Sequence, residues 1–482
     1  MRIQKITLEQ VLRARDRRAD IQNEMLGRLS GREAASGCLV CLTMNIAGEI
    51  KRTPMTRALF LRGISELEAS GPDIIERRII DEPSGSEAFW LLPEDAPRMK
   101  SRLEAVEDSF PAARLFDFDV LTRARPPEEG KIPDAAQTVT KLSRASARKC
   151  LICGRPAAEC ARSRAHGLDA VRAATSSLLS GFCADSLADE ACGSLLDELY
   201  TTPKPGLVDL ANCGAHTDMD VPLFEKSAEC LRPYFRDAVM LGMNGCGMKE
   251  LRDRGLEAER EMFRVTSGVN THKGIIYSMG LMLAGMGRVL AEAESLPDGS
   301  EDDSFDVTEA QAREYAAELA KQDAEERLAA SAASPETNGG KVLSVYGAEG
   351  AVREAASGFP HAAYCASRLR YYTERAENTE KVMETVPDDG HAVSRRAGVL
   401  AFCDCMAGLE DTNLLHRGGK EGLDFARNEA ARIGSLTDFD ERISELARLD
   451  KLMTERNLSP GGSADMLALA YLTERWRFLF KD

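Results

Sequence analysis

The stretch Gly274–Ala293 reads GIIYSMGLMLAGMGRVLAEA, and its apolar residues recur at the 3.6-residue spacing of an α-helix. Met279, Met282 and Met286 stand at helical spacing, which indicates side chains of a hydrophobic core rather than a cofactor site. The uncharged run over residues 274–287 is shorter than the ~20 residues that a membrane-crossing helix needs. The stretch therefore predicts a core helix of a soluble domain.

The same spacing recurs on both sides of this stretch, from about Leu168 to the end of the sequence. The glycines in the stretch each weaken a helix by roughly 1 kcal/mol against alanine, and they are tolerable where helices or a ligand approach closely. Because no run of alternating β-branched residues follows Leu168, we expect an all-α domain with glycine-rich connections. The other helical segments are Ala170–Leu179, Ser194–Leu199, Leu223–Phe235 and Ala397–Leu409.

Residues 297–340 differ from the rest of this half. They are rich in Asp, Glu, Ala and Gln and hold few large apolar side chains. This composition predicts a solvated acidic insertion made of helix and flexible linker, to which we assign no function.

The first part of the chain mixes helix and strand patterns. Thr7 and Gln10 form a capping box before an amphipathic helix over Leu8–Leu29, which Gly31 can end. Short apolar runs bounded by loops are typical of strands. We therefore expect two domains, an α+β domain over residues 1–172 and a larger all-α domain over residues 173–482. The expected strands are Cys38–Leu42, Phe89–Leu92 and Leu115–Leu121.

Composition excludes several classes of function. The 482 residues include 62 Lys and Arg against 78 Asp and Glu, a net charge of -16, so a long nucleic-acid footprint is not expected. The N-terminal stretch is charged throughout and lacks the apolar core of a signal peptide, which favours a cytoplasmic protein with no membrane partner. Thirteen cysteines, an odd number, then favour free thiols or a metal site over a disulfide framework.

Two acids stand in the strand-like run that ends at Leu121. Asp117 and Asp119 are two residues apart, so they share one strand face with Cα atoms roughly 7 Å apart. Such a pair suits Mg²⁺ that carries a polyphosphate, and we predict a catalytic and metal-binding role for both. The alternative is a pair of solvent-facing acids on an edge strand.

A dense basic cluster follows between residues 143 and 166. Arginine side chains bind phosphate oxygens bidentately, so a polyanionic substrate is the expected ligand of this cluster. The predicted substrate-binding residues here are Arg148, Arg162, Arg164 and His166.

Three cysteines and a histidine lie within the same segment. Cys150 and Cys153 have the Cys-x₂-Cys spacing of metal ligands, and Cys160 and His166 follow closely. Two interpretations stay open, a compact zinc site and a helical turn that contains thiols.

These residues resemble a known family over roughly residues 5–170, the apo-citrate lyase phosphoribosyl-dephospho-CoA transferases. The resemblance implies transfer of a phosphoribosyl-dephospho-CoA group to a serine of an apo acyl carrier protein, with loss of pyrophosphate. The nucleophile then belongs to the partner, the acyl carrier subunit of citrate lyase. The motifs that carry the resemblance are Arg15–Arg18 with Gln22, Met44–Gly48, Leu115–Leu121, Arg148–Cys153 and Cys160–His166.

The helical half contains several loops that combine small residues with a cation or a carboxylate. A loop of this kind that opens a helix presents backbone N–H groups to phosphate. None is a P-loop or a dinucleotide-binding fingerprint. The loops are Thr201–Asp209 with Gly214–Met219, Thr266–Gly274, Asp411–Gly419 and Asn457–Asp465.

Together these loops resemble triphosphoribosyl-dephospho-CoA synthase over about residues 185–482. Glu354 with Ser357–Pro360, and the segment Arg252–Glu259, fit the same pattern, whereas Ser267 and Cys213 depart from it. The resemblance implies that the 2′-hydroxyl of dephospho-CoA joins C1 of the ATP ribose and that adenine leaves with the triphosphate intact.

That reaction assigns expected roles to residues of the loops. Departure of adenine builds positive charge at C1, so a carboxylate near C1 and a base for the hydroxyl are needed, and Asp209 and Asp218 are expected in these roles, in either order. His272 and His416 are the expected acids that protonate adenine, whereas His361 and His391 are expected to be structural. Mg²⁺ would be held by Asp411 and Asp465. The predicted substrate-binding residues are Lys204, Asn270, Lys273, Arg417, Ser459, Gly461 and Gly462.

We therefore expect a bifunctional enzyme that makes the citrate lyase prosthetic group from ATP and dephospho-CoA and attaches it to the carrier. One alternative is the equivalent enzyme that serves malonate decarboxylase, whose synthase shares several of the motifs. The other is a non-catalytic adaptor that binds the carrier protein and is stabilised by zinc.

Overall fold

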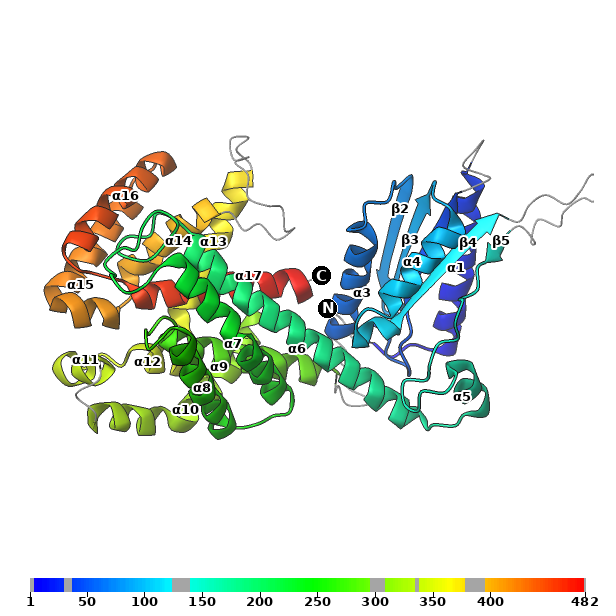
Figure 1. Cartoon of the computed structure of the whole chain (residues 1–482), viewed down its shortest axis with the longest axis horizontal. Helices are drawn as coiled ribbons and strands as arrows, with labels where there is room; N and C mark the ends of the chain where they lie inside the picture. The colour runs from blue at the N-terminus through cyan, green and yellow to red at the C-terminus, as the bar shows by residue number, and fades with distance from the viewer. Residues whose placement is uncertain are drawn as a thin grey trace, which may run out of the picture. The chain divides into compact units, whose positions relative to one another are not determined.

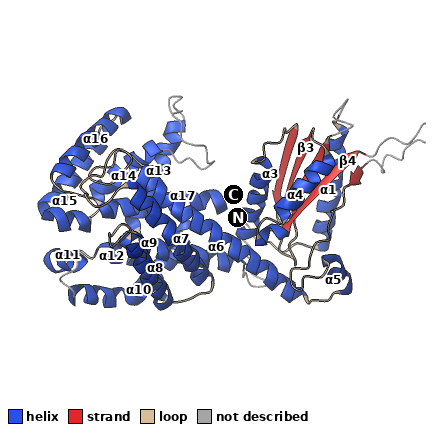
Figure 2. Cartoon of the chain, viewed as in Figure 1, coloured by secondary structure: helices blue, strands red, loops and turns tan. Residues whose placement is uncertain are grey.

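The structure, a computed structural model, divides the chain into two compact units (Figure 1). The first unit comprises Met1–Cys183 and Ala293–Val307, and the second comprises Ala184–Glu292 and Thr308–Lys481. The strands lie in the first unit and the second is helical, which confirms an α+β domain followed by a larger all-α domain (Figure 2). The described residues are 4–29, 37–123, 139–294, 308–333, 338–377 and 395–480.

The first unit contains a five-stranded antiparallel sheet with the strand order β2-β3-β1-β4-β5. The three strands expected from the sequence are confirmed as β1, β3 and β4. The sequence did not predict β2, in which charged residues flank the adjacent Ile79 and Ile80, or β5, which has only three residues. The strands are β1 (Cys38–Met44), β2 (Glu76–Glu82), β3 (Gly85–Leu92), β4 (Phe116–Arg123) and β5 (Val139–Lys141).

Helix α1 (Leu8–Gly27) covers one face of this sheet. Both hydrogen bonds of the predicted capping box between Thr7 and Gln10 are present. The helix ends at Gly27, so the expectation that it continues to Leu29 and ends at Gly31 is wrong, and Gly31 lies outside the described residues. Leu29 is nevertheless buried, in the cluster that joins Met25 and Leu26 of α1 to β1, β3 and β4.

The opposite face packs against α3 (Pro54–Glu68) and α4 (Ala96–Glu107). A Cβ on Gly63 of α3 would lie 2.9 Å from the Phe116 ring, so the helix lies directly on β4. Lys100 of α4 donates a hydrogen bond to the carbonyl oxygen of Phe118 at 2.8 Å. Burial along β4 alternates, with Phe116, Phe118 and Val120 buried and the two intervening acids half-buried. A short 3₁₀ helix, Pro111–Leu115, precedes β4, and α5 (Ala157–Ser163) follows the sheet.

Helix α9 (Lys273–Glu294), which contains the opening stretch, lies in the core of the helical unit. Met279, Met282 and Met286 are at most 1% exposed, which confirms their core role. By length and composition α9 is apolar enough to cross a membrane, but 78% of its most apolar window is buried against the rest of the protein, as in a core helix.

Two glycines of α9 allow close helix packing. A Cβ on Gly285 would lie 2.0 Å from the carbonyl oxygen of Ala312, and one on Gly287 would lie 2.2 Å from that of Val239. The expectation that these glycines permit close approach is confirmed. The described helices of this unit are α6 (Leu168–Tyr200), whose residues up to Cys183 belong to the first unit, α7 (Val221–Met243), α8 (Met248–Val265), α9, α10 (Glu309–Ala333), α11 (Asn338–Tyr346), α12 (Gly350–Ala356), α13 (Pro360–Glu377), α14 (Arg395–Gly408), α15 (Thr412–Gly434), α16 (Phe439–Glu455) and α17 (Gly461–Phe480).

The predicted acidic insertion over 297–340 is only partly among the described residues. Its described helix, α10, buries Ala312, Ala316 and Ala320 completely. The expectation of a solvated segment is therefore wrong for α10, because alanines rather than large apolar residues form its packed face. Its origin as an insertion, and the domain boundary expected between residues 172 and 173 inside α6, stay predictions.

Candidate functional site

A cavity of about 1610 Å³ in the helical unit is lined by the first residues of α9, α15 and α17. The loop 215–219 and the segment 347–354 also contribute to its lining. The cavity thus collects most of the site residues predicted for this half, although they come from separate parts of the sequence. Those in its lining are Asp218, Asn270, His272, Lys273, Asp411, His416, Arg417, Ser459, Gly461, Gly462 and Asp465.

Three helix N-termini on one cavity favour a polyanionic ligand. Each N-terminus presents unpaired backbone N–H groups and the positive end of a helix dipole. At α17 the approach is especially close, because a Cβ on Gly461 would lie 2.5 Å from Nδ2 of Asn413. A Cβ on Gly462 would likewise lie 3.1 Å from Oδ2 of Asp411. The two glycines therefore allow α17 to begin directly beside the start of α15.

Asp411 joins these two helix starts. Its Oδ1 accepts hydrogen bonds from the backbone N–H groups of Asn413 and Leu414, so the residue is the N-cap of α15. Its Oδ2 accepts from the backbone N–H and the hydroxyl of Ser463 in α17. Burial raises the pKa of Asp411. Both carboxylate oxygens of Asp411 thus already accept hydrogen bonds. The geometry favours a structural role, in which Asp411 holds the starts of α15 and α17 together, over the metal-binding role expected from the sequence.

Asp465 is the carboxylate in the cavity that is best placed to bind a cation. It accepts no hydrogen bond from the described residues, and a Cβ on Gly274 would lie 2.5 Å from its Oδ2. Burial raises its pKa well above the ordinary value, and the carboxylates of Glu198 and Asp411 add to this increase. A bound cation would relieve that repulsion, so this donor set fits a divalent metal.

Asp209 and Lys204 are not part of the cavity lining. Asp209 accepts hydrogen bonds from Thr202 Oγ1 and from the backbone N–H groups of Lys204, Ala211 and Asn212, so it orders its own loop. Lys204 is 1% exposed and forms a buried ion pair with Glu198. The geometry therefore does not support the catalytic role expected for Asp209 or the phosphate-binding role expected for Lys204.

The two histidines expected to act as acids both line the cavity, but neither favours the charged form. His272 is buried and its Nδ1 lies 2.6 Å from Ser227 Oγ, and burial lowers its pKa to about 3. His416 is exposed, and partial burial, with Lys341 and Arg417 nearby, lowers its pKa. His272 is therefore neutral near pH 7, which argues against an imidazolium acid at this position.

The structure identifies a different histidine in the cavity, one that we expected to be structural. His361 lies at the start of α13, and its Nδ1 is 2.8 Å from Oε2 of Glu354. The hydrogen bond to Glu354 raises the pKa of His361. The sequence signal was the motif Glu354 with Ser357–Pro360, whose next residue is His361. His391, the other histidine expected to be structural, lies outside the described residues.

Arg417 connects two loops at the cavity. Its Nη1 donates to the carbonyl oxygen of Ala215 at 2.9 Å and to Oδ1 of Asn457 at 2.8 Å. Its Nη2 lies 3.2 Å from Nδ1 of His216, and Nε2 of His216 lies 2.9 Å from the hydroxyl of Ser459. His216 is another cavity residue that the sequence interpretation did not select. The network positions Arg417 beside the cavity.

Lys273 and Asp218 are more accessible to a ligand. Lys273 opens α9 and pairs with Glu259 at 2.5 Å, and its side chain is 54% exposed. Its backbone N–H donates to Oδ1 of Asn270. Asp218 is exposed at the cavity and lies close enough to Arg417 and His216 to influence their pKa values.

In the first unit, Asp117 and Asp119 lie on the sheet face that α1 covers. Asp119 is paired directly with Cys41, and Cys41 packs against Met25 and Leu26 of α1 on that face. Strand β4 lies between β1 and β5, but β5 pairs only with Leu121–Arg123, so among the described residues β1 alone pairs with the part of β4 that holds the two acids, and the edge-strand alternative stays open. Asp117 binds Arg148 at 3.1 Å and Asp119 binds Lys141 at 2.5 Å.

The same face carries a second polar group. Arg18 of α1 donates through Nε to Oε1 of Glu87 at 2.9 Å, and Glu87 is 2% exposed. Gln22 lies 3.5 Å from the sulfur of Cys41. Arg18 and Gln22 belong to the motif that carried the resemblance, whereas Glu87 was not selected from the sequence.

The arginines of the basic cluster between residues 143 and 166 lie in different surroundings. Arg148 pairs with Glu107 and Asp117 and is half-buried beside β4. Arg162 and Arg164, at the end of α5, are exposed. His166, the remaining substrate-binding candidate of this half, lies with the three cysteines.

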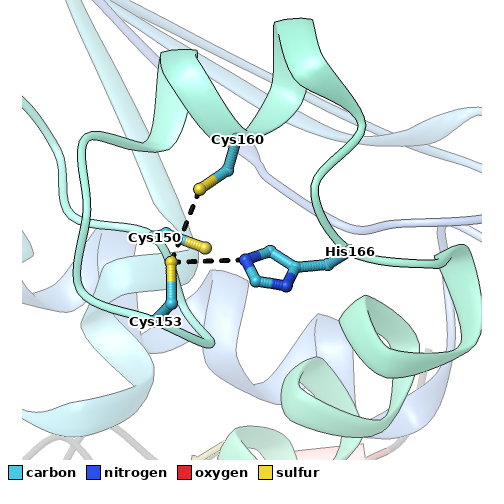
Figure 3. Close-up of side chains that lie close together, drawn as sticks. All are labelled: Cys150, Cys153, Cys160 and His166. Carbon is cyan, nitrogen blue, oxygen red and sulfur yellow. Dashed lines mark hydrogen bonds between the residues drawn. The ribbon is translucent and has the colours of Figure 1, made fainter.

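Cys150, Cys153, Cys160 and His166 converge (Figure 3). Their ligand atoms all lie within 4.8 Å of one another. Cys153 Sγ is 3.5 Å from Cys160 Sγ and 3.3 Å from Nε2 of His166. All thirteen cysteines of the chain are free thiols.

Comparison with known families agrees with the division of the chain into two units. The family model of ATP:dephospho-CoA triphosphoribosyl transferase, CitG, matches residues 184–479, more than half of the chain. The chain belongs to the CitG family. Residues 6–182 match the model of apo-citrate lyase phosphoribosyl-dephospho-CoA transferase, CitX. We refer to residues 6–182 as the CitX half and to residues 184–479 as the CitG half.

Similar proteins share this organisation in whole or in part. Protein CitXG of Haemophilus influenzae is 32% identical over 481 residues, covering 96% of this chain and 95% of the relative. The 2-(5''-triphosphoribosyl)-3'-dephosphocoenzyme-A synthase of Haemophilus ducreyi is 33% identical and covers 66% of this chain and 97% of the relative. The chain is therefore a CitX–CitG fusion, a transferase of citrate lyase prosthetic-group maturation.

Proposed function

We propose that the CitG half joins dephospho-CoA to the ribose of ATP and that the CitX half attaches the product to the apo acyl carrier subunit of citrate lyase. The observation that carries the first reaction is the cavity where three helix N-termini, Asp218, His361 and Asp465 meet. It combines binding groups for a triphosphate with the acid and base that cleavage of a base–sugar bond requires.

In the first reaction ATP is the ribosyl donor. The bond between C1 of the ribose and adenine breaks, and a bond forms between C1 and the 2′-oxygen of dephospho-CoA. Asp218 receives the hydroxyl proton as base, since it is an exposed cavity carboxylate that lies near Arg417 and accepts no hydrogen bond from the described residues. His361 gives a proton to the departing adenine. The helix N-termini, Lys273 and Arg417 bind the triphosphate.

The donor set around Asp465 fits Mg²⁺. Asp465 and Glu198 line the cavity, and the carboxylate of Glu198 adds to the rise that burial causes in the pKa of Asp465. When bound, Mg²⁺ would neutralise charge on the triphosphate. Asp411 would contribute by holding the start of α17, and thus Asp465, in place.

The volume of the cavity suits two substrates. Pockets that bind one drug-sized ligand measure about 300–1,000 Å³. This cavity measures about 1610 Å³. A second pocket of about 290 Å³ adjoins it and shares Arg252, Lys273 and Gly350 with it. Its apolar side chains, including Leu251 and Ile276, fit the adenine base or the pantetheine arm of dephospho-CoA.

In the second reaction the hydroxyl of a carrier serine attacks the phosphorus nearest the ribose, and pyrophosphate leaves. Asp117 and Asp119 would hold Mg²⁺, and Arg148, beside Asp117, would bind phosphate oxygens. The exposed Arg162 and Arg164 would bind the acidic surface of the carrier or the phosphates of the donor. We propose a cytoplasmic location, because thirteen free thiols suit a reducing compartment.

Product analysis tests the first reaction. The full chain is incubated with ATP, Mg²⁺ and dephospho-CoA, and the released nucleobase or nucleotide is identified by chromatography. Free adenine in equal amount to the consumed ATP is expected. Release of ADP or AMP would refute ribosyl transfer, and the absence of any turnover would favour the adaptor alternative.

The carrier specificity is tested separately. The purified apo-carriers of citrate lyase and of malonate decarboxylase are each offered to the enzyme, and attachment is followed by the mass of the carrier. Modification of the citrate lyase carrier alone is expected. Preferential modification of the other carrier would support the malonate decarboxylase alternative.

A further inference from the structure

We propose that Cys150, Cys153, Cys160 and His166 form a structural zinc site, which holds the arginine-rich segment of the CitX half against β4. The metal site does not depend on the proposed function, although its effect on carrier attachment does.

The geometry of the four side chains matches a tetrahedral site. In a tetrahedral site, Zn–S bonds of about 2.3 Å and Zn–N bonds of about 2.0 Å place two sulfurs about 3.8 Å apart and a sulfur and a nitrogen about 3.5 Å apart, so the corresponding distances here are each about 0.2–0.3 Å shorter. The observed distances are 3.5 Å from Cys153 Sγ to Cys160 Sγ and 3.3 Å from Cys153 Sγ to His166 Nε2 (Figure 3). A disulfide would instead require about 2.05 Å between sulfurs.

The backbone around the first two cysteines also favours bound thiolates. The N–H of Ile152 points to the sulfur of Cys150 at 3.5 Å, and Arg155 Nε donates to the sulfur of Cys153 at 3.4 Å. Gly154 has a φ of 73°, which a residue without a side chain adopts most easily. This turn directs Cys150 and Cys153 toward the same point.

The segment needs such a crosslink because it has almost no core. Between Ser143 and His166, all of them described, Cys160 is the only buried residue. Helix α5 has seven residues, too few to be stable in isolation. Small units without a hydrophobic core are usually held by disulfides or a metal, and these cysteines are free.

The site is linked to the predicted phosphate-binding residues. Arg114 lies two residues before the start of β4. Its side chain donates hydrogen bonds to the carbonyl oxygens of Lys149 and Cys150, both at 3.1 Å. Arg148 lies two residues before Cys150 and contacts Asp117. Loss of the metal would therefore release Arg148 and its neighbours from the end of β4.

Metal analysis of the full chain tests the site. We expect about one zinc per chain after purification under reducing conditions, and less than one tenth of that in Cys160→Ser. Cys246→Ser, which changes a half-buried cysteine of the CitG half, is the matched control and should keep the metal. Cobalt exchanged into the site should give the absorption of tetrahedral thiolate coordination.

A second variant keeps the test informative if Cys160→Ser does not fold. His166→Cys supplies a fourth thiolate, so it should retain one metal and strengthen the thiolate-to-cobalt absorption. Folded, metal-free wild-type protein in the presence of zinc, or a disulfide between Cys153 and Cys160 in the reduced preparation, would overturn the proposal. So would full metal content in folded Cys160→Ser.

A functional readout separates the metal site from the proposed reactions. Chelation of the metal should reduce attachment to the carrier at least tenfold and leave adenine release unchanged once Mg²⁺ is restored. If zinc is present but the protein releases no adenine before chelation, the metal site stands and the proposed function fails.

Discussion

Oε2 of Glu354 lies 2.8 Å from Nδ1 of His361, at the edge of the cavity in the CitG half. Glu354 also accepts the backbone N–H of His361 at 2.8 Å through Oε1, so one carboxylate fixes both the ring and the start of α13. The pair leaves Nε2 of His361 as the ring atom that can give a proton.

The pair predicts how adenine release depends on pH. Since the hydrogen bond to Glu354 raises the pKa of His361 above its ordinary value of 6.5, the ring is charged at low pH and active as an acid. The rate constant for adenine release should therefore be highest below that pKa and fall as pH rises through it. A pH profile of single-turnover adenine release measures this.

Two substitutions separate the roles of the pair. His361→Gln should lower the rate of adenine release by about 10²–10⁴-fold, the range of general acid catalysis. Glu354→Gln should keep activity at low pH and shift the falling limb of the profile to lower pH. His416→Gln, an exposed histidine of the same cavity, is the control, and a loss as large as that of His361→Gln would reassign the acid.

Asp465 predicts a response to Mg²⁺ that thermal unfolding can measure. In the wild type, Mg²⁺ should raise the melting temperature, because it relieves repulsion between Asp465 and Glu198. Asp465→Asn should melt at a higher temperature than wild type without Mg²⁺, gain little from its addition and release no adenine. Asp424→Asn, an exposed change on α15, should behave as wild type. An unchanged response in Asp465→Asn would exclude this carboxylate as a ligand.

Asp117 predicts that the two activities can be separated. Asp117→Asn should abolish attachment to the carrier, because the change removes one charge of the metal-binding pair, and should leave adenine release intact. Asp108→Asn tests for a general effect of charge, since Asp108 is exposed and binds Arg144. Both products are followed by chromatography in the same reaction. Loss of both activities in Asp117→Asn would show that the two sites depend on one another.

Asp81 predicts the acid stability of the CitX half. Burial alone raises its pKa, but hydrogen bonds from Arg52, Ser86 and Arg57 outweigh that effect and hold the pKa below its ordinary value of 3.8. The stabilisation is therefore present above about pH 4 and is lost as pH falls through the lowered value.

The two tryptophans make this measurable for one half at a time. Trp90 is fully buried in the sheet and Trp476 is buried in α17. In a Trp476→Phe background, urea unfolding followed by fluorescence reports the CitX half. Asp81→Asn should lower its stability at pH 7 by about 1–3 kcal/mol, as expected when a half-buried carboxylate that accepts charged hydrogen bonds is replaced, and should flatten its decline between pH 5 and 2. An equally steep decline in the variant would assign the acid sensitivity to other carboxylates.

Much of the fold was predictable because its signals are local. The period of α9 and the apolar runs of β1, β3 and β4 each lie within one segment. Strand β2 has only two apolar residues among charged ones, and its pairing with β3 is not a local signal. The loops of the cavity were recognised as a set, and Asp218, Lys273, Asp411 and Asp465 do share it.

The roles within the cavity were less predictable, because they depend on partners far away in the sequence. Lys204 was expected to bind phosphate, but Glu198 pairs with it in the interior. His272 carries a strong motif, yet burial keeps it neutral, and His361 gains its charge from Glu354. Spacing identifies which residue types are available and does not show how burial sets their protonation.

The glycines of α9 connect core packing to the reaction. Gly287 lies against the backbone of α7, and the same rigid helix begins with Lys273 at the cavity, about 20 Å away along its axis. A methyl group added at Gly287 should shift the helix along its length and displace Lys273 from Glu259 and the neighbouring His272 from Ser227. A substitution at Gly287 would therefore lower the measured rate of the reaction, although residue 287 does not line the cavity.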